Sequence, residues 1–237
     1  MPESLDNNSE HVAAWRNAEK LAEMSLGQGH EGEVILHTYN TEQGEMRVAQ
    51  KEVSSLEEAQ RGYGVYTKLK EAGLPVANFY KIRTYTNEYG NKVVGVVMED
   101  LSEGGKYTVE PASQGTGPTA RDEVAEAADP TKLKKEMVRA LAVMHNNGIY
   151  DFHLGISLFV RSEIDNPQNV DFLFLDYTNM EDPDNPRRPR DTIDFDKECI
   201  QDRVALMQGI GVRRDEEDEL VAYYQQLREQ GIKTYSA

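Results

Sequence analysis

Residues 26–34 place three glycines between two predicted strands, and this feature constrains the fold more than any other. The stretch reads Leu-Gly-Gln-Gly-His-Glu-Gly-Glu-Val. Because glycine has no Cβ, such a turn brings backbone N–H groups close to an anion such as phosphate. β-Branched and aromatic residues follow from Val34 to Tyr39, so the chain is predicted to continue as a strand. A dinucleotide-binding turn opens a helix at this point, and that class is therefore disfavoured.

A second strand is predicted from Met46 to Val53, and it carries Lys51. A lysine on a strand beside a glycine turn is typical of sites where an ammonium group contacts the phosphates of ATP. The motif residues that we expect to bind ATP are Gly27, Gln28, Gly29, Gly32, Val34 and Lys51. The alternative is an ordinary β-hairpin with flexible glycines and a surface lysine, because short motifs also occur by chance.

The composition excludes several classes of protein. The 237 residues allow one sizeable core or two smaller ones. The formal net charge of −16 repels nucleic-acid backbones and anionic membranes, so neither is an expected partner. No apolar stretch reaches the roughly 18 residues of a membrane span, and the polar N-terminus is unlike a signal peptide, so a soluble cytoplasmic protein is expected. The single cysteine, Cys199, allows no internal disulfide and is expected to pack in the core.

The first hundred residues are predicted to be rich in strands. Apolar residues between Glu10 and Met24 recur at near-helical spacing and predict an amphipathic helix in an N-terminal extension, residues 1–25. A capped helix is predicted to begin near Leu56, and strands are predicted over 79–86 and 92–98. With the strand that leads into the glycines, this gives five strands and one helix.

The composition changes after residue 101. Residues 102–129 are rich in Gly, Pro, Ser, Thr and acidic residues, which predicts a flexible excursion. The pair Asp129-Pro130 is a strong helix start, and this helix is predicted to end at Gly148. Short strands are predicted over 158–161 and 172–175, with helices near 196–208 and 215–230.

The order of these parts resembles the protein-kinase-like superfamily over roughly residues 26–180. The glycine turn, the strand lysine, a helix with glutamates and the string Met98-Glu99-Asp100-Leu101 follow one another as in that family. Residues 151–155, Asp-Phe-His-Leu-Gly, then resemble the D-x-H-x-G loop of atypical members of bacterial or phage type.

The resemblance implies an α+β, two-lobed fold. A five-stranded N-lobe with one helix would span residues 26–101, and a reduced, mainly helical C-lobe would span residues 130–237. Only two predicted helices follow residue 176, so the C-lobe is expected to be minimal.

The resemblance also implies an ATP site. Lys51 would contact the α- and β-phosphates and pair with a glutamate of the following helix. Glu58 is the expected partner, and the neighbouring Glu57 stays open as an alternative. The hinge residues that would surround the adenine are Met98, Glu99 and Leu101.

Phosphoryl transfer depends on positioning and on neutralising charge. By resemblance, Asp151 would orient or deprotonate the acceptor hydroxyl with His153 beside it, and Asp176 would hold Mg²⁺. Ile156 occupies the place of a metal-binding asparagine, and Ser157 next to it offers an oxygen instead. A second register, which matches residues 151–153 to H-R-D, would leave Leu158 at the asparagine position and a degenerate site.

The expected function is ATP-dependent transfer of the γ-phosphoryl group to a hydroxyl, on a serine or threonine of a protein. One alternative is a small-molecule phosphotransferase, because residues 72–76, Ala-Gly-Leu-Pro-Val, resemble the aminoglycoside-kinase-like branch. Another is a pseudokinase scaffold without turnover, which Ile156 favours. Adenylyl transfer from a reversed ATP and the oligomeric state stay open.

Overall fold

The structure of the protein is a computed structural model, which describes residues 19–28, 33–41, 44–86, 90–112, 120–151, 157–186 and 193–235. The chain divides into two compact units. Unit 1 contains the described residues up to Tyr63 together with Ala77–Gly104. Unit 2 contains Gly64–Val76 and the described residues from Gly105 onward.

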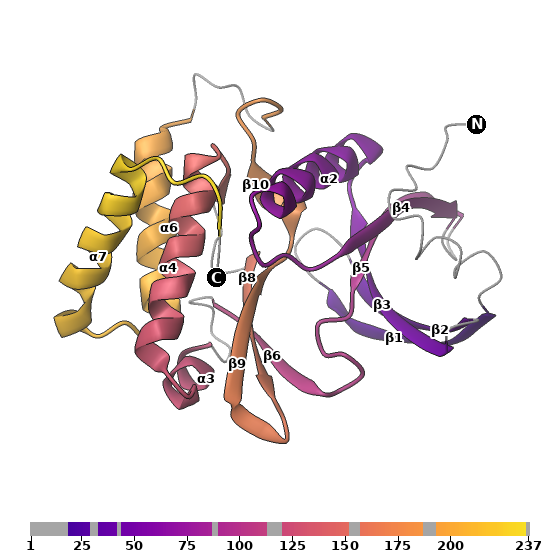
Figure 1. Cartoon of the computed structure of the whole chain (residues 1–237). Helices are drawn as coiled ribbons and strands as arrows, with labels where there is room; N and C mark the ends of the chain where they lie inside the picture. The colour runs from indigo at the N-terminus through magenta and orange to yellow at the C-terminus, as the bar shows by residue number, and fades with distance from the viewer. Residues whose placement is uncertain are drawn as a thin grey trace. The chain divides into compact units, whose positions relative to one another are not determined.

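Unit 1 is built on a five-stranded antiparallel sheet with the strand order β1-β2-β3-β5-β4 (Figure 1). The strands are β1 (Glu19–Gln28), β2 (Glu33–Thr41), β3 (Gly44–Val53), β4 (Phe79–Thr86) and β5 (Lys92–Glu99). Helix α2 (Leu56–Glu71) begins in this unit, and its residues from Gly64 onward belong to unit 2. The five strands and the helix after Lys51 are as predicted, and the mixed α/β class is confirmed.

The predicted N-terminal helix is wrong where the structure describes it. From Glu19 onward the chain is strand β1, in which Met24 lies opposite Leu36 of β2. Leu21 and Met24, which contributed to the helical spacing, are 52% and 54% exposed and form no buried helical stripe. Pairing of the backbone with β2 therefore determines the conformation here, and the sparse apolar spacing does not. The rest of the predicted helix lies outside the described residues.

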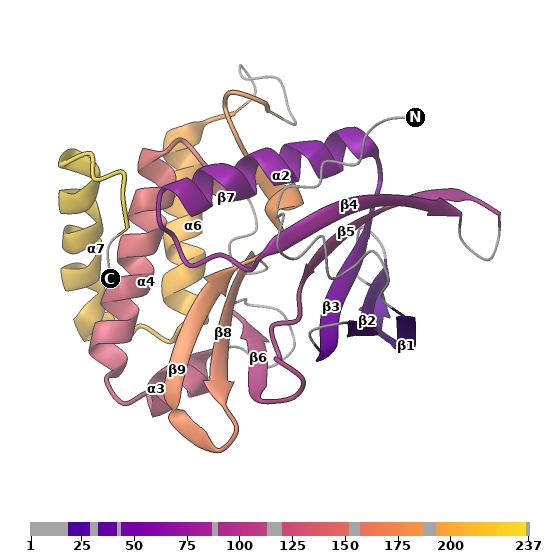
Figure 2. The ribbon, with the colours of Figure 1, turned by 45° about the vertical axis from the view of Figure 1, so that its right-hand side comes forward.

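Unit 2 combines helices with two small sheets. Helix α4 contacts both α6 and α7, and Figure 2 shows the three side by side. The helices are α3 (Arg121–Glu126), α4 (Pro130–Asn146), α6 (Phe195–Gly209) and α7 (Arg214–Glu229), with a 3₁₀ turn η1 (Tyr177–Asn179). The strands are β6 (Tyr107–Pro111), β8 (Leu158–Glu163) and β9 (Asn166–Phe174) in one antiparallel sheet, and β7 (Tyr150–Asp151) with β10 (Met180–Glu181) in the other.

Local sequence signals set the limits of α4. The Asp129 side chain accepts a hydrogen bond from the Lys132 N–H at 2.9 Å, and Pro130 occupies the first turn. Gly148 has a φ of +77°, a left-handed conformation that ends the helix at little steric cost. Met137 and Met144 lie on its buried face, so this helix forms where it was predicted.

The predicted flexible excursion over 102–129 is partly wrong. Strand β6 lies within it and pairs with β8, with Tyr107 opposite Glu163. Helix α3 also lies within it and buries Val124. The β-favouring Tyr-Thr-Val sequence and the available edge of β8 explain the strand. Residues 113–119, with half of the Gly and Pro residues of this segment, lie outside the described residues.

The C-terminal segment contacts the end of α2 within unit 2. The backbone N–H of Tyr235 donates to the carbonyl oxygen of Ala72 at 2.7 Å, and the Tyr235 hydroxyl donates to Glu136 at 3.0 Å. Gly73 has a φ of +75°, and a Cβ at this position would lie 2.7 Å from the carbonyl oxygen of Tyr235. Only glycine fits this close approach without a shift of the backbone.

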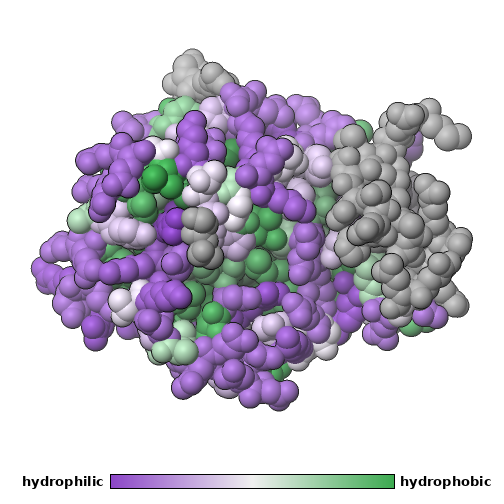
Figure 3. Space-filling view, viewed as in Figure 1, coloured by the Kyte–Doolittle hydropathy of each residue, from purple (hydrophilic) through white to green (hydrophobic). Residues whose placement is uncertain are grey.

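The surface agrees with the polar composition. The face in Figure 3 is mostly hydrophilic, with smaller groups of hydrophobic atoms between the polar ones. Among the residues that the structure describes, no helix is long and apolar enough to cross a membrane. Cys199 is buried, as predicted from its isolation in the sequence.

Candidate functional site

In unit 1, three of the predicted ATP-binding residues lie in one row across the sheet. Gly27 of β1 is opposite Val34 of β2, Val34 is opposite Lys51 of β3, and Lys51 is opposite Val96 of β5. Side chains at directly opposed positions of neighbouring strands point to the same face. Lys51 therefore shares a face with Val34, about 10 Å from Gly27 as judged from two strand spacings.

This face of the sheet is apolar around the single lysine. Alternation along the strands puts Val34 and Leu36 of β2, and Ala49 and Lys51 of β3, on the same side. Val34, Ala49 and Lys51 are partly exposed. A partly open apolar surface beside one ammonium group suits a base that needs apolar contacts and phosphates that need charge. The backbones of Gly27 and Gln28 are described, whereas Gly29 and Gly32 lie outside the described residues.

The opposite face of the same sheet combines a buried hydrophobic cluster of Tyr39, Val48 and Val97 with polar side chains that bond to one another. Gln50 is 3% exposed, and Arg83 Nη1 lies 3.4 Å from its Oε1 and 3.3 Å from the Tyr39 hydroxyl. The Tyr85 hydroxyl donates to Glu52 at 2.7 Å. Burial, with this hydrogen bond, raises the pKa of Tyr85 to about 12.

Glu58 is buried in the first turn of α2 and has a structural function there. Its N–H donates to the Ser55 hydroxyl at 3.1 Å, and its carboxylate accepts from the Ser54 N–H at 3.0 Å and from the Ser54 hydroxyl. This reciprocal pattern is a capping arrangement. Glu57 is largely exposed and pairs with Arg61 at 3.1 Å. Of the two candidate partners for Lys51, only Glu58 is buried, and its pairing with Lys51 stays a prediction.

The predicted hinge follows the end of β5. Met98 and Leu101 are buried at 4% and 7% exposure. The Glu99 N–H donates to the Asn78 carbonyl at 2.9 Å, and the Glu99 carboxylate accepts from the Asn78 N–H at 2.9 Å. The Glu99 N–H is therefore already engaged, and contacts of this segment with adenine stay a prediction.

Asp100 fixes the turn after β5. Its carboxylate accepts from the N–H groups of Ser102 and Gly104, each at 3.1 Å, and from the Ser102 hydroxyl at 2.7 Å. The Nε atom of Arg47 lies 3.3 Å from the same carboxylate. The turn is thus held by a buried charge with several hydrogen-bond partners, which the sequence motif did not reveal.

In unit 2, Asp151 is fully buried at the end of strand β7. Its exposed fraction is 0%, and its backbone N–H donates to Oδ2 of Asp202 at 3.0 Å. Asp151 lies opposite Met180 in the two-stranded sheet. His153 and Ile156 lie outside the described residues.

The backbone of Asp151 is anchored by a buried chain of polar groups that the sequence analysis missed. His145 Nε2 lies 2.9 Å from Oδ2 of Asp202, and His145 Nδ1 lies 2.6 Å from the hydroxyl of Tyr224. We call Asp202, His145 and Tyr224 the anchor network. It joins α4, α6 and α7 to the N–H of Asp151.

Burial sets the protonation of the anchor network. It raises the pKa of Asp202 to about 8. It also lowers the pKa of His145 to about 3, and the charge of Arg228 acts in the same direction. Near neutral pH the pair of His145 and Asp202 therefore holds one proton, and the pair has no net charge in the interior.

Asp176 follows strand β9 in a left-handed conformation, with φ of 61° and ψ of 43°. Its Oδ1 accepts from the Thr178 hydroxyl at 3.1 Å, and its Oδ2 accepts from the Asn179 amide at 2.7 Å. The side chain is partly exposed. Aspartate is one of the few non-glycine residues that adopts this conformation readily, and here its side chain bonds to the two residues that follow in the turn.

Ser157 precedes β8 and is bonded to the residue before Asp176. Its carbonyl oxygen accepts from the N–H of Leu175, the residue before Asp176, at 2.8 Å. The Ser157 hydroxyl is buried and has no hydrogen-bond partner among the described residues. Carboxylate and hydroxyl oxygens are hard ligands, and Mg²⁺ is often held by one or two carboxylates plus phosphates and water. The Asp176 carboxylate is an oxygen ligand of the type that Mg²⁺ prefers, and the described residues contain no group of three His, Cys, Asp or Glu that could bind a metal.

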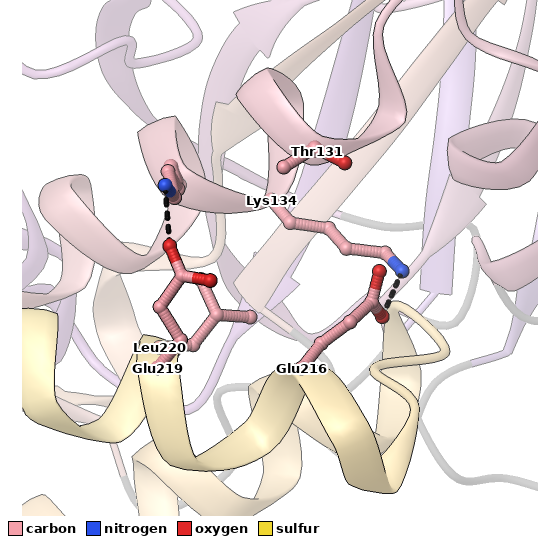
Figure 4. Close-up of a pocket in the computed structure, with 6 residues that line it drawn as sticks. Thr131, Lys134, Glu216, Glu219 and Leu220 are labelled. Atoms are coloured by element: carbon pink, nitrogen blue, oxygen red, sulfur yellow. Dashed lines mark hydrogen bonds and ion pairs between the residues drawn. The ribbon is translucent and has the colours of Figure 1, made fainter.

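A small pocket lies between α4 and α7 in unit 2 (Figure 4). Its volume is about 30 Å³, room for a water molecule. Lys134 pairs with Glu216 at 2.9 Å, and Lys135 pairs with Glu219 at 2.7 Å. The charged side chains that line this pocket form two ion pairs, and its volume is too small for a nucleotide.

The known proteins that resemble this chain do not reveal its function. No family model matches the sequence, and no curated protein matches it. A solved structure described as WaaP in complex with acyl carrier protein is similar at 16% sequence identity and a TM-score of 0.48. The match covers 93% of this chain and 83% of that chain. A likeness at this level identifies neither a family nor an activity.

Proposed function

We propose that the protein binds ATP on the Lys51 face of the unit 1 sheet and transfers the γ-phosphoryl group to a hydroxyl. The observation that carries this proposal is the row of Gly27, Val34 and Lys51, three motif residues that the strand register aligns. The two compact units are compatible with the two lobes of a protein-kinase-like fold, which we include in the proposal.

Each candidate residue has one task in this proposal. Lys51 binds phosphate oxygens, and the backbone beside Gly27 faces the same anion. Asp176 holds Mg²⁺, with Ser157 as a neighbouring oxygen. Mg²⁺ neutralises the charge of the phosphates when it is bound. Asp151 accepts the proton of the acceptor hydroxyl, and the anchor network fixes its backbone.

The proposed acceptor is a serine or threonine hydroxyl of a protein. A second candidate function is nucleotide binding without transfer. The complete burial of Asp151 favours this second function, because a base must reach the proton that it accepts.

The first test is the melting temperature of the full chain with ATP, with and without Mg²⁺. A ligand at a hundredfold excess over its Kd stabilises the native state by about 2.7 kcal/mol. We expect a metal-dependent rise in wild type, a loss of the rise in Lys51→Ala, and a normal rise in Lys92→Ala, a lysine at the exposed start of β5. No rise at millimolar ATP in wild type would overturn the proposal.

The second test separates transfer from binding. Labelled γ-phosphate is followed into a protein mixture and into a panel of hydroxyl-bearing small molecules. Transfer by wild type that Asp151→Asn abolishes, with ATP binding intact, supports the proposed activity. Binding without transfer to either acceptor class supports the second candidate, and labelling of the small molecules alone contradicts the protein acceptor.

A further inference from the structure

The conformation of Asp176 depends on the residues that follow it. Tyr177 is 2% exposed, and its hydroxyl donates to the carbonyl of Phe174 at 2.8 Å. Its ring lies 5.3 Å from the ring of Tyr66 of α2, within unit 2. Tyr177 is thus fixed by burial on the carboxyl side of Asp176. The turn cannot relax to an extended conformation without exposing this ring.

The same short segment also reaches the second candidate carboxylate. Asn179 N–H donates to the Asp176 carbonyl at 3.0 Å, which closes the turn. The next residue, Met180, pairs with Asp151 in the two-stranded sheet. Residues 176–180 therefore connect the metal candidate to the backbone of Asp151. A residue within this segment is close enough to Asp176 to be a ligand of the same metal ion.

Asn179 has the geometry of a ligand partner for Asp176. Its amide nitrogen Nδ2 lies 2.7 Å from Oδ2 of Asp176. Two adjacent oxygens in the octahedral shell of Mg²⁺ lie roughly 2.9 Å apart, because each Mg–O bond is about 2.05 Å. A half-turn of the terminal torsion exchanges the nitrogen and oxygen of the amide. The same side chain then directs an oxygen, in place of a donor, to the edge of the carboxylate.

The carboxylate can accept these contacts and still bind a cation. A carboxylate has about four lone-pair sites, two on each oxygen. Thr178 occupies one site on Oδ1, and Asn179 occupies one site on Oδ2. Rotation of the amide removes its N–H from Oδ2, whereas the Thr178 hydroxyl still donates to Oδ1.

We propose that Asn179 supplies the second protein oxygen to the divalent cation at Asp176, which Ile156 cannot supply. This assignment rests on the proposed function. In the structure the Asn179 amide donates to Asp176. Rotation of this amide would direct its oxygen to a cation held by Asp176. Two oxygens three residues apart thus form a compact pair on one turn.

The test is a Mg²⁺ titration of the full chain at saturating ATP, with the melting temperature as the readout. Asn179→Leu removes both the donor and the oxygen, and we expect its Mg²⁺ midpoint to rise at least tenfold. Asn179→Asp keeps an oxygen and adds a charge, and we expect its midpoint to stay within about threefold of wild type or to fall. Asn185→Leu, at an exposed asparagine of unit 2, is the matched control.

The outcomes separate the possible roles of Asn179. An equal rise in Asn179→Asp and Asn179→Leu would show that the amide acts only as a donor, which overturns the ligand assignment. An unchanged Asn179→Leu would also overturn it, and a raised midpoint in Ser157→Ala would then assign the oxygen to Ser157. If wild type shows no Mg²⁺-dependent shift, the proposed function fails as well. Melting without ligand checks that each variant folds.

Discussion

The Lys51 face of unit 1 and the anchor network of unit 2 place polar groups in opposite environments. Lys51 is partly exposed on an apolar sheet surface, and its neighbours come from adjacent strands. His145 and Asp202 are each 2% exposed, and 57 positions separate them in the chain. The comparison teaches that a polar group at a partly exposed position stays in contact with solvent, whereas buried polar groups must bond to one another and thereby hold helices of the fold together.

The largest effect is expected in the anchor network. Asp202→Ala removes the partner of both His145 and the Asp151 N–H. We expect a loss of about 3–5 kcal/mol in the free energy of unfolding, because buried polar groups are left without partners. Urea unfolding measures it. Asp196→Ala, at an exposed residue of the same helix, should change stability by less than about 0.5 kcal/mol. Equal losses in the two variants would break the comparison.

A second effect is a pH dependence that the anchor network produces. In the folded state Asp202 has a raised pKa of about 8, and His145 has a lowered pKa of about 3, so the pair keeps one proton between these values. In the unfolded state the ordinary values are 3.8 and 6.5. The unfolded pair therefore loses its last proton above pH 6.5, and the folded pair above pH 8.

Stability should fall between these limits, because the folded state binds more protons than the unfolded state there. We expect a decrease of about 2 kcal/mol from pH 6.5 to 8 and little change from this pair between pH 4 and 6.5. Urea unfolding at several pH values measures the slope. Asp202→Asn keeps an acceptor for the Asp151 N–H and should remove the slope. A slope that persists in this variant would assign it to other groups.

A smaller effect is expected at the start of α2. Ser55→Ala removes the hydroxyl that accepts the Glu58 N–H. The expected loss is about 1 kcal/mol, as for other helix caps. Gln60→Ala, at an exposed position in the same helix, serves as the control and should be near neutral. If Ser55→Ala is also neutral, the hydroxyl does not stabilise the helix start.

The smallest effect on stability is expected at Lys51, on the sheet of unit 1. Lys51→Ala should change the free energy of unfolding without ligand by less than about 1 kcal/mol, because the side chain is partly exposed. The same variant is expected to lose the response to ATP. A destabilisation as large as that of Asp202→Ala would mean that Lys51 belongs to the structural core, and the nucleotide proposal would lose its main support.

The sequence predicted unit 1 well, because its signals are local. Alternation of apolar residues, two turns and the glycines define each strand, and the register then aligns Val34 with Lys51. The exception is Glu19–Met24, where helical spacing predicted a helix. The spacing of apolar residues shows only which side chains share a face. The strand forms because its backbone pairs with β2, which lies farther along the chain.

The sequence predicted the elements of unit 2 but not its anchor network. Asp129 and Pro130 reveal where α4 begins, whereas Asp202 and Tyr224 meet His145 only after the helices pack. One signal was present, because Asp202 shares the buried face of α6 with Cys199 and Leu206. An acidic residue on an apolar helical stripe must find a buried partner. The partner itself cannot be read from local sequence.

The close approach of Gly73 to Tyr235 has a consequence for tracing the ancestry of this chain. A side chain at position 73 would collide with the carbonyl of Tyr235 and would also meet an unfavourable φ of +75°. A lineage that keeps the C-terminal contact can therefore change this glycine only after it has lost or moved that contact. The two features should appear or disappear together among descendants of a common gene.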